Sequence, residues 1–279
     1  MLLNGQQVQC LTLTAVLLHN NVFDSLKIME NNMEYILLTG ASSGVGRELA
    51  IYLSKKYYLI LNGRNKERLL ETKNRCDNDA LIWPYDLTNT EELELELSGW
   101  IKNNGIAIKS VVYCAGLMKM VPLRSVDVKA LRDTFATNVF APELITKVLT
   151  ARKVNAKNLK SIVFISSNIS NRGAAAFSVY GSSKAGLDGL MRNLAVELAP
   201  SVRVNSVLPG GMITEMTKDL FADENVKKEF ERNYPLGIGT PAEIAPMVEF
   251  LISDNSRWIT GQQFTVDGGR TIDITERSR

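Results

Sequence analysis

The sequence predicts an α/β fold: a single domain with a doubly wound, seven-stranded parallel sheet whose two faces are covered by helices. Three observations support this prediction. From Glu34 onward, short β-rich runs alternate with longer helical patterns, as stacked βαβ units require. A glycine-rich turn joins the first strand directly to the first helix. No internal repeat or flexible linker interrupts the alternation.

The expected strands are short runs with β-rich composition, each followed by a turn or a helical pattern. In chain order they are Tyr35 to Thr39, Tyr58 to Asn62, Ala80 to Tyr85, Ser110 to Cys114, Ser161 to Ser166, Val202 to Leu208 and Gln263 to Val266. The helical patterns between them include Gly44 to Lys55, Lys66 to Arg75, Glu91 to Lys102, Val128 to Leu149, Tyr180 to Leu198 and Pro241 to Ile252. Together these elements define a domain over residues 34–270.

Both ends of the chain lie outside this pattern. Residues 1–33 are expected to form an N-terminal extension of unknown role, and residues 271–279 a C-terminal tail. The apolar stretch from Cys10 to Leu18 is too short for a secretory signal and lacks its basic start. Met29 and Met33 are alternative start positions.

The composition excludes several function classes. Apolar residues make up 45% of the chain and charged residues 22%, and no apolar run approaches the roughly 18 residues that span a bilayer, so we expect a soluble protein without a membrane partner. The 32 basic and 30 acidic residues are mixed along the chain and leave a net charge of +2. Without a basic stripe, a nucleic-acid partner is not expected.

Cysteine and histidine usage narrows the chemistry. The three cysteines, Cys10, Cys76 and Cys114, are widely spaced and odd in number, which indicates reduced thiols and a cytoplasmic protein. None has metal-ligand spacing. His19, the single histidine, precedes the first strand, so histidine-dependent hydrolysis and a histidine-ligated metal are not expected.

The glycine-rich turn spans Thr39 to Gly46 and predicts a Rossmann-type dinucleotide site. Gly40 permits the tight turn, Gly44 lets the backbone approach a pyrophosphate, and Gly46 allows close packing of helix on strand. The helix N-terminus attracts anionic phosphates. The remaining members of this expected phosphate site are Ser42, Ser43 and Val45.

The end of the second strand predicts which dinucleotide binds. An NAD site would place an acidic residue there, but the sequence reads Leu61-Asn62-Gly63-Arg64-Asn65. Arg64 can bind a 2′-phosphate, so NADP(H) is the expected cofactor; the alternative is a solvated surface arginine. Asp86, followed by Leu87, closes the third strand and is expected to accept a hydrogen bond from the adenine, with a helix cap as the alternative.

A second constellation predicts acid–base chemistry. Ser167 follows a buried strand, and Tyr180 and Lys184 lie four apart at a helix start, on one face. At about 4 Å and an effective dielectric of about 20, an ammonium favours a phenolate by about 4 kcal/mol, or about 3 pKa units. We therefore expect Lys184 to lower the Tyr180 pKa towards neutrality. Spacing alone would indicate only an amphipathic helix; the glycine turn and Ser167 give the pair its meaning.

These features predict reduction of a carbonyl. Ser167 would hydrogen-bond the substrate carbonyl and Tyr180 would protonate the developing alkoxide while the nicotinamide supplies hydride. Lys184 would also donate to the nicotinamide ribose hydroxyls and hold the ring beside the reacting carbon.

From about Glu34 to Arg270 the chain resembles the short-chain dehydrogenase/reductase family. The resemblance implies that Asn138, in Ala136-Thr137-Asn138-Val139, is a fourth catalytic residue that holds a water beside the lysine; a polar group bending a helix is the alternative. It also implies cofactor contacts after the fourth and sixth strands. Those residues are Ala115 and Gly116, and then Pro209, Gly210, Met212 and Thr214. A mobile substrate lid is implied over Thr214 to Asn233.

The closing segments Ile259-Thr260-Gly261-Gln262 and Val266-Asp267-Gly268-Gly269 are similar to those of 3-oxoacyl-acyl-carrier-protein reductases. This similarity implies a homotetramer or homodimer. One departure is Cys114, where the family usually has Asn; we expect altered local hydrogen bonding and retained activity.

The substrate is less well defined by the sequence. A 3-oxoacyl thioester or similar ketone is the leading hypothesis, and the alternatives are a sugar, polyol or hydroxysteroid dehydrogenase and a cofactor-binding sensor without catalysis. Small residues from Gly173 to Ala176 would leave room for an acyl arm between Met118 and Phe177, or they are packing residues. A basic cluster would meet an acyl carrier protein or is a solvated face. Its members are Arg152, Lys153, Lys157 and Lys160.

Overall fold

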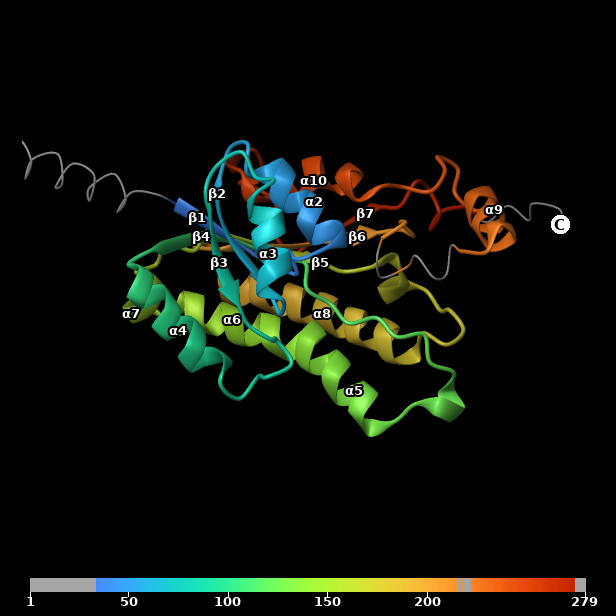
Figure 1. Ribbon diagram of the computed structural model, residues 1–279, viewed down its shortest axis with the longest axis horizontal. Coiled ribbons are helices and arrows are strands. Elements are labelled where there is room, and N and C mark those ends of the chain that lie inside the picture. The colour runs from blue at the N-terminus through green and yellow to red at the C-terminus, as the bar shows by residue number, and fades with distance from the viewer. Residues whose placement is uncertain (1–33, 215–216, 218–221, 274–279) are drawn as a thin grey trace, which may run out of the picture.

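The computed structural model of the protein describes residues 34–214, 217 and 222–273 (Figure 1). The expected N-terminal extension lies outside the described residues, as do most of the expected tail and part of the expected lid. What is described is the α/β domain itself.

The sheet matches the sequence-based prediction: seven strands, all parallel, in the order β3-β2-β1-β4-β5-β6-β7. The strands are β1 (Glu34–Thr39), β2 (Tyr58–Gly63), β3 (Ala80–Pro84), β4 (Ala107–Tyr113), β5 (Ser161–Ile165), β6 (Arg203–Pro209) and β7 (Gln263–Val266). The order reverses direction between β1 and β4. In open parallel sheets, ligands bind beyond the carboxyl ends of the strands at such a reversal.

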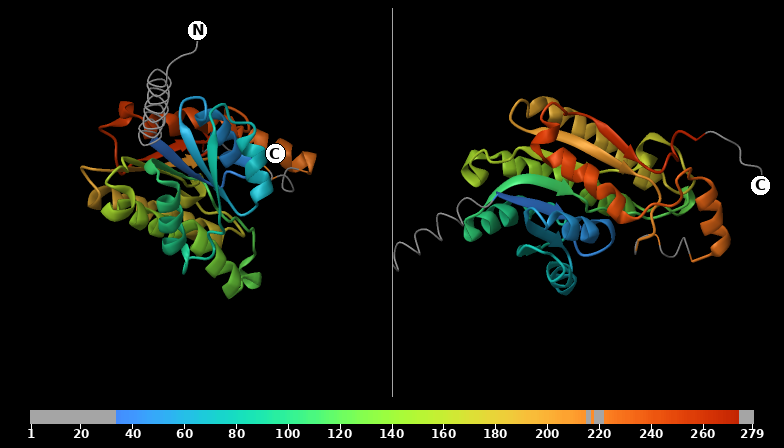
Figure 2. Two further views of the ribbon diagram at one scale, coloured as in Figure 1. Left: turned by 60° about the vertical axis from the view of Figure 1, so that its left-hand side comes forward. Right: turned by 90° about the horizontal axis from the view of Figure 1, so that it is seen from above.

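Helices cover both faces of the sheet (Figures 1 and 2). One face packs against α4 (Leu93–Asn104), α6 (Ala141–Thr150) and α8 (Ser178–Glu197), and the other against α2 (Gly44–Leu53), α3 (Lys66–Lys73) and α10 (Ala245–Ile252). The remaining helices are α5 (Val128–Phe135), the short α7 (Arg152–Asn155) and α9 (Glu224–Arg232). In Figure 1, α7 and α9 lie at opposite ends of the molecule.

Two apolar cores hold these layers together, because successive side chains of a strand point to opposite faces. Leu37 of β1 packs in the core that includes Ile145 of α6 and Leu187 of α8. Its neighbour Leu38 packs in the other core, with Leu49 of α2. Strands buried on both faces explain the continuous apolar runs that identified them in the sequence.

The element boundaries shift by a few residues from the predicted ones. Among the strands, the largest change is in β4, which begins at Ala107 rather than Ser110 because Glu34 and Tyr35 of β1 pair with Ala107 and Ile108 across a local irregularity in register. The segment from Pro241 to Ile244 forms a 3₁₀ turn before α10 begins.

The predicted helical stretch from Val128 to Leu149 is confirmed as helical along its length. Within it, a π-helical turn, Ala136–Phe140, separates α5 from α6. The wider turn frees the Thr137 carbonyl, which accepts a 2.5 Å hydrogen bond from the Tyr113 hydroxyl. It also turns Asn138 toward the loop after β4, where its amide is bound. π-Turns inside α-helices occur frequently at functional sites.

Candidate active site

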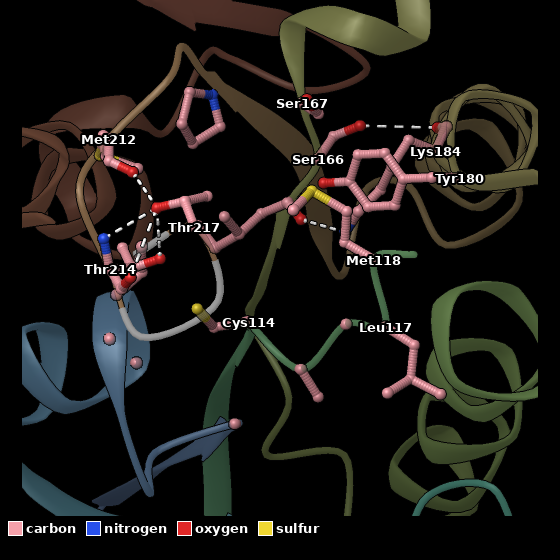
Figure 3. A pocket seen from close by; sticks show the side chains of 18 of the residues that line it. Cys114, Leu117, Met118, Ser166, Ser167, Tyr180, Lys184, Met212, Thr214 and Thr217 are labelled. Atoms are coloured by element: carbon pink, nitrogen blue, oxygen red, sulfur yellow. Dashed lines mark hydrogen bonds between the residues drawn. The ribbon is translucent and has the colours of Figure 1, made fainter. Parts of the chain in front are cut away.

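A cavity of about 810 Å³ lies beyond the carboxyl ends of the strands (Figure 3). Every predicted cofactor-binding residue lines it, and so do Ser167, Tyr180 and Lys184. Of the predicted site residues, Asn138 alone is not at the cavity wall; it is fully buried behind it. The fold therefore brings the glycine turn and the Tyr-Lys pair to a single cavity.

The glycine turn has a geometry that only glycine permits at two positions. Gly40 has a φ of +68°, and a Cβ there would lie 2.8 Å from the Ala115 backbone. A Cβ on Gly46 would lie 2.1 Å from the Gly40 carbonyl oxygen. At the start of α2, Ser43 makes no side-chain cap and the first turn carries no acidic residue. Its amide groups thus suit an anionic pyrophosphate.

Arg64 and Asp86 lie at the far end of this wall. Arg64 Nη1 is 4.0 Å from Asp86 Oδ2, and both side chains are largely exposed. Asp86 Oδ1 accepts hydrogen bonds from the amide and hydroxyl of Thr88, at 3.0 and 2.9 Å. These contacts close a local turn and do not cap a helix, because α4 begins at Leu93 with Glu92 at its N-cap position. The second oxygen of Asp86 faces Arg64.

Sequence reasoning did not single out Asn62, which organises the same region. Its side-chain amide nitrogen donates to the backbone carbonyls of Trp83 and Tyr85, at 3.0 and 3.3 Å. Its backbone carbonyl accepts from Ala41 N at 2.9 Å. Asn62 thus ties the ends of β2 and β3 to the glycine turn. The sequence signal for this role was a polar residue in an otherwise apolar strand, and the structure shows that Asn62 is fully buried.

The acid–base residues come from β5 and α8. Ser167 follows β5, and Tyr180 and Lys184 lie in the first turns of α8, so their side chains face the cavity together (Figure 3). The Lys184 ammonium is buried, donates a 2.8 Å hydrogen bond to the Ile165 carbonyl, and lies 5.8 Å from the centre of the Tyr180 ring.

The expected lowering of the Tyr180 pKa is wrong for this arrangement. Burial raises the pKa of Tyr180 to about 12, and a hydrogen bond with Ser167 offsets only part of that effect. Burial also lowers the pKa of Lys184 to about 8. The sequence-based argument counted the attraction between the two groups but not the cost of removing each from water. The phenol is therefore protonated at neutral pH.

Asn138 connects the loop after β4 to helix α8. Its amide oxygen accepts from Leu117 N at 2.8 Å, and its amide nitrogen donates to Leu117 O at 3.0 Å and to Ser183 Oγ at 2.9 Å. The amide oxygen and the Lys184 ammonium both approach Gly116, since a Cβ there would lie 3.5 Å from the oxygen and 3.4 Å from the Lys184 nitrogen. Asn138 thus fixes one wall of the cavity relative to the acid–base residues.

Cys114 directly follows β4, next to these groups. Its backbone nitrogen and that of Ala115 both donate to Thr39 Oγ1, at 3.1 Å each, which joins β4 to β1. Burial raises the pKa of the Cys114 thiol to about 12, against the lowering influence of Lys184. The thiol is thus neutral at physiological pH, and the backbone keeps its two hydrogen bonds to Thr39.

The opposite wall comes from the segment after β6. Thr217 Oγ1 donates to the Met212 carbonyl at 2.5 Å and accepts from Thr214 N at 2.9 Å (Figure 3). Nearby, the Tyr234 hydroxyl accepts from Gly211 N at 2.7 Å. Thr217 and Tyr234 line the cavity but were not among the predicted site residues. Thr217 lies in the expected lid segment and Tyr234 just after it, outside any of the expected strands and helices.

The expected substrate walls are present in part. Met118, Gly173, Ala174 and Phe177 line the cavity, whereas Ala175 and Ala176 do not. Arg172 and Arg270 also line it and were missed by the sequence reasoning. They lie in loops after β5 and β7, and only the fold brings them together.

The basic cluster around α7 has a different place. It immediately precedes β5, at the amino ends of the strands, whereas the cavity lies beyond their carboxyl ends. A carrier protein bound there would face away from this cavity. The geometry therefore favours the alternative interpretation, a solvated face.

None of the helices described is long and apolar enough to cross a membrane. In the described residues, no group of three or more histidine, cysteine and acidic side chains is arranged to hold a metal ion.

Known proteins are similar to this chain in sequence and in fold. The sequence profile of a family described as enoyl-(acyl carrier protein) reductase matches residues 40–271. L-xylulose reductase from Caenorhabditis elegans is 34% identical over 247 residues, 84% of this chain and 94% of that protein. 3-Oxoacyl-[acyl-carrier-protein] reductase FabG from Rickettsia bellii is 34% identical over 241 residues, 84% of this chain and 95% of that protein.

A solved structure extends the comparison. 4-Hydroxyisoleucine dehydrogenase complexed with NADH matches with a TM-score of 0.80 and 27% identity, over 86% of this chain and 99% of that one. The similar proteins named above include both reductases and a dehydrogenase.

Proposed function

Because the chain belongs to the short-chain dehydrogenase/reductase family of oxidoreductases, we propose that it reduces a ketone to a secondary alcohol with NADPH. One observation carries this proposal: Tyr180 and the buried Lys184 face the same cavity as the glycine turn. A protonated phenol is the form required of a general acid in the reductive direction.

Four residues of the cavity and its surroundings contribute to the proposed reaction. Ser167 hydrogen-bonds the substrate carbonyl oxygen, and Tyr180 donates its proton to that oxygen as negative charge develops. Bound nicotinamide supplies the hydride to the carbonyl carbon. Lys184 carries a positive charge beside Tyr180 and orients the ribose hydroxyls, while Asn138 holds the adjoining loop and keeps the proton path next to Lys184 in place.

The preference for NADPH rests on Arg64. No acidic residue ends β2, and the largely exposed Arg64 side chain lines the cavity, free to turn from Asp86 to a 2′-phosphate. The glycine turn and the uncapped start of α2 suit the pyrophosphate of either dinucleotide.

For the substrate, we propose a 3-oxoacyl thioester or similar ketone. The similarity to a 3-oxoacyl-acyl-carrier-protein reductase and the open wall at Gly173 and Ala174 support this class. The equal identity to L-xylulose reductase keeps a sugar or polyol as the second candidate. We further propose a cytoplasmic homotetramer or homodimer, with an acyl carrier protein as a partner if the thioester is the substrate.

A screen of ketones, acyl thioesters and ketoses tests the proposal, with oxidation of NADPH and NADH followed at 340 nm. We expect turnover on at least one carbonyl, with NADPH favoured at least tenfold. Tyr180→Phe should lower kcat by about 10²–10⁴-fold, the usual contribution of a general acid. Tyr58→Phe, at the far end of β2, is the matched control. Full activity of Tyr180→Phe would refute the assignment of the acid, and wild-type binding without turnover would favour a sensor.

A further inference from the structure

Two arginines meet at the wall of the cavity that the mechanism leaves unused. Arg172 follows the 3₁₀ turn after Ser167, and Arg270 follows β7. Arg172 Nη1 donates a 3.3 Å hydrogen bond to the Arg270 carbonyl oxygen, although the two residues are 98 positions apart in the chain. Both are half-buried, and both line the cavity.

These two positive charges are not neutralised locally. Among the described residues, no carboxylate lies within 4.0 Å of either guanidinium. The acid in this region, Asp267, is bound elsewhere: it accepts from Gly269 N, Thr271 N and Thr271 Oγ1, at 3.1, 2.8 and 2.5 Å. Asn168 donates to the same carboxylate at 3.3 Å.

Tyr234 lines the same cavity, and its hydroxyl accepts from Gly211 N at 2.7 Å. Burial raises the pKa of this phenol, the hydrogen bond with Gly211 and the charges of Arg270 and Arg172 act in the opposite direction, and the charge of Asp267 adds to the rise. The Tyr234 hydroxyl can also donate to a ligand in the cavity.

We propose that Arg172 and Arg270 form an anion subsite that binds a carboxylate or phosphate of the substrate and so orients its ketone toward Tyr180. This inference rests on the proposed ketone reduction in the same cavity. Planar guanidinium groups match the geometry of carboxylates and phosphates, and their hydrogen bonds to an anion are strengthened by charge. Because the two guanidinium groups are partly buried and have no carboxylate partner in the described part of the chain, an anionic group of the substrate would stabilise them.

The experiment compares pairs of substrates in which one member carries a negative charge and the other does not. Pyruvate, acetoacetate and 4-oxopentanoate are each paired with their methyl esters, and acetoacetyl coenzyme A is paired with S-acetoacetyl-N-acetylcysteamine, which lacks phosphate. The first set tests a carboxylate on the substrate, and the second tests the phosphates of a thioester arm. We expect the wild type to favour the charged member of at least one pair by about 10–100-fold in kcat/KM, the usual loss when a charged hydrogen bond is removed.

Variants connect the preference to the two residues. Arg270→Gln and Arg172→Gln should each reduce the ratio of kcat/KM for the charged substrate to that for its neutral partner by about 10-fold or more. Arg192→Gln, an exposed arginine of α8 outside the cavity, is the matched control and should keep the wild-type ratio. Tm and NADPH affinity verify that each variant is folded.

Binding separates this inference from the proposed function. Calorimetric titration of the NADP⁺-loaded protein with 4-oxopentanoate and its methyl ester requires no turnover. Binding of the acid that is lost in Arg270→Gln would support the anion subsite even if no ketone were reduced. Equal treatment of charged and neutral partners in both turnover and binding, or ratios unchanged in both variants, would overturn the subsite and leave ketone reduction standing.

Discussion

The Lys184 ammonium donates a 2.8 Å hydrogen bond to the Ile165 carbonyl, at the buried end of β5. This contact gives the buried ammonium a backbone partner beneath the cavity, but removal of the charge from water outweighs it and lowers the pKa of Lys184 to about 8. The same burial raises the pKa of Tyr180 to about 12. The two groups thus carry their protons at neutral pH but lose them in very different ranges.

The first prediction concerns pH. Because the lysine pKa is depressed below its ordinary value of 10.5, the ammonium is present at pH 7 and is lost as pH rises through about 8. Tyr180 keeps its proton throughout this range. We expect kcat/KM for ketone reduction to be level below pH 7.5 and to fall above pH 8, measured between pH 6 and 10 with protein stability verified at each value.

A variant tests the assignment of that alkaline limb. Lys184→Arg keeps a positive charge to above pH 12, so whatever activity remains should not fall between pH 8 and 10. A wild-type profile that stays level to pH 10, or a limb that persists in Lys184→Arg, would contradict the role of Lys184.

A second prediction concerns the stability supplied by Asn138. Asn138→Ala removes three hydrogen bonds and leaves the backbone groups of Leu117 and the Ser183 hydroxyl without this partner. We expect the free energy of unfolding in urea to fall by about 2–4 kcal/mol, since each buried group left unpaired costs about 1–3 kcal/mol. Activity should fall at least tenfold because Leu117 lines the cavity.

Asn104→Ala provides the control for this change. The Asn104 amide donates to the Trp100 carbonyl at an exposed site, where water replaces the lost partner. Its unfolding free energy should change by less than about 0.5 kcal/mol. Similar losses in the two variants would mean that the position of Asn138 behind the cavity has no special importance.

A third prediction concerns cofactor choice. Arg64→Ala should raise KM for NADPH by about 10–100-fold and leave KM for NADH within about twofold, because only NADPH carries the 2′-phosphate. Steady-state kinetics with both dinucleotides measures this. Arg75→Ala, whose side chain pairs with Glu48 and does not line the cavity, is the control. Equal effects on NADPH and NADH would assign Arg64 to the surface rather than to cofactor selection.

The fold was predictable because its strands are buried on both faces. Strands such as β1 carry uninterrupted apolar runs, and a glycine turn with the steric limits of Gly40 and Gly46 leaves few residue choices. The π-turn around Asn138 was not predictable, because the apolar spacing from Val128 to Leu149 continues on both sides of it. Its cause is tertiary: the bonds to Leu117 and from Tyr113 form only after β4 is in place.

The candidate site was also predictable from the sequence only in part. The spacing of Tyr180 and Lys184 predicted that they share a helix face, but their proton affinities depend on burial, which spacing does not specify. Arg172 and Arg270 carry no local signal, since each is a lone charged residue in a loop. Only the parallel order of β5, β6 and β7 brings their loops to one edge of the sheet.

A last prediction compares two glycines, one closely surrounded by other atoms and one with open space where a side chain would lie. A Cβ at Gly46 would lie 2.1 Å from the Gly40 carbonyl oxygen, so Gly46→Ala must push α2 away from β1 and open the glycine turn. We expect a loss of stability of about 1–3 kcal/mol, as in other overpacked sites, together with loss of detectable NADPH binding. Gly99, inside α4, has no atom within 4 Å of its added Cβ, and alanine there should stabilise by about 0.5–1 kcal/mol. Thermal unfolding and fluorescence titration with NADPH measure both variants. Because the two substitutions add the same methyl group, a Gly46→Ala protein that bound NADPH normally would contradict the close packing of α2 against the turn as the basis of the cofactor site.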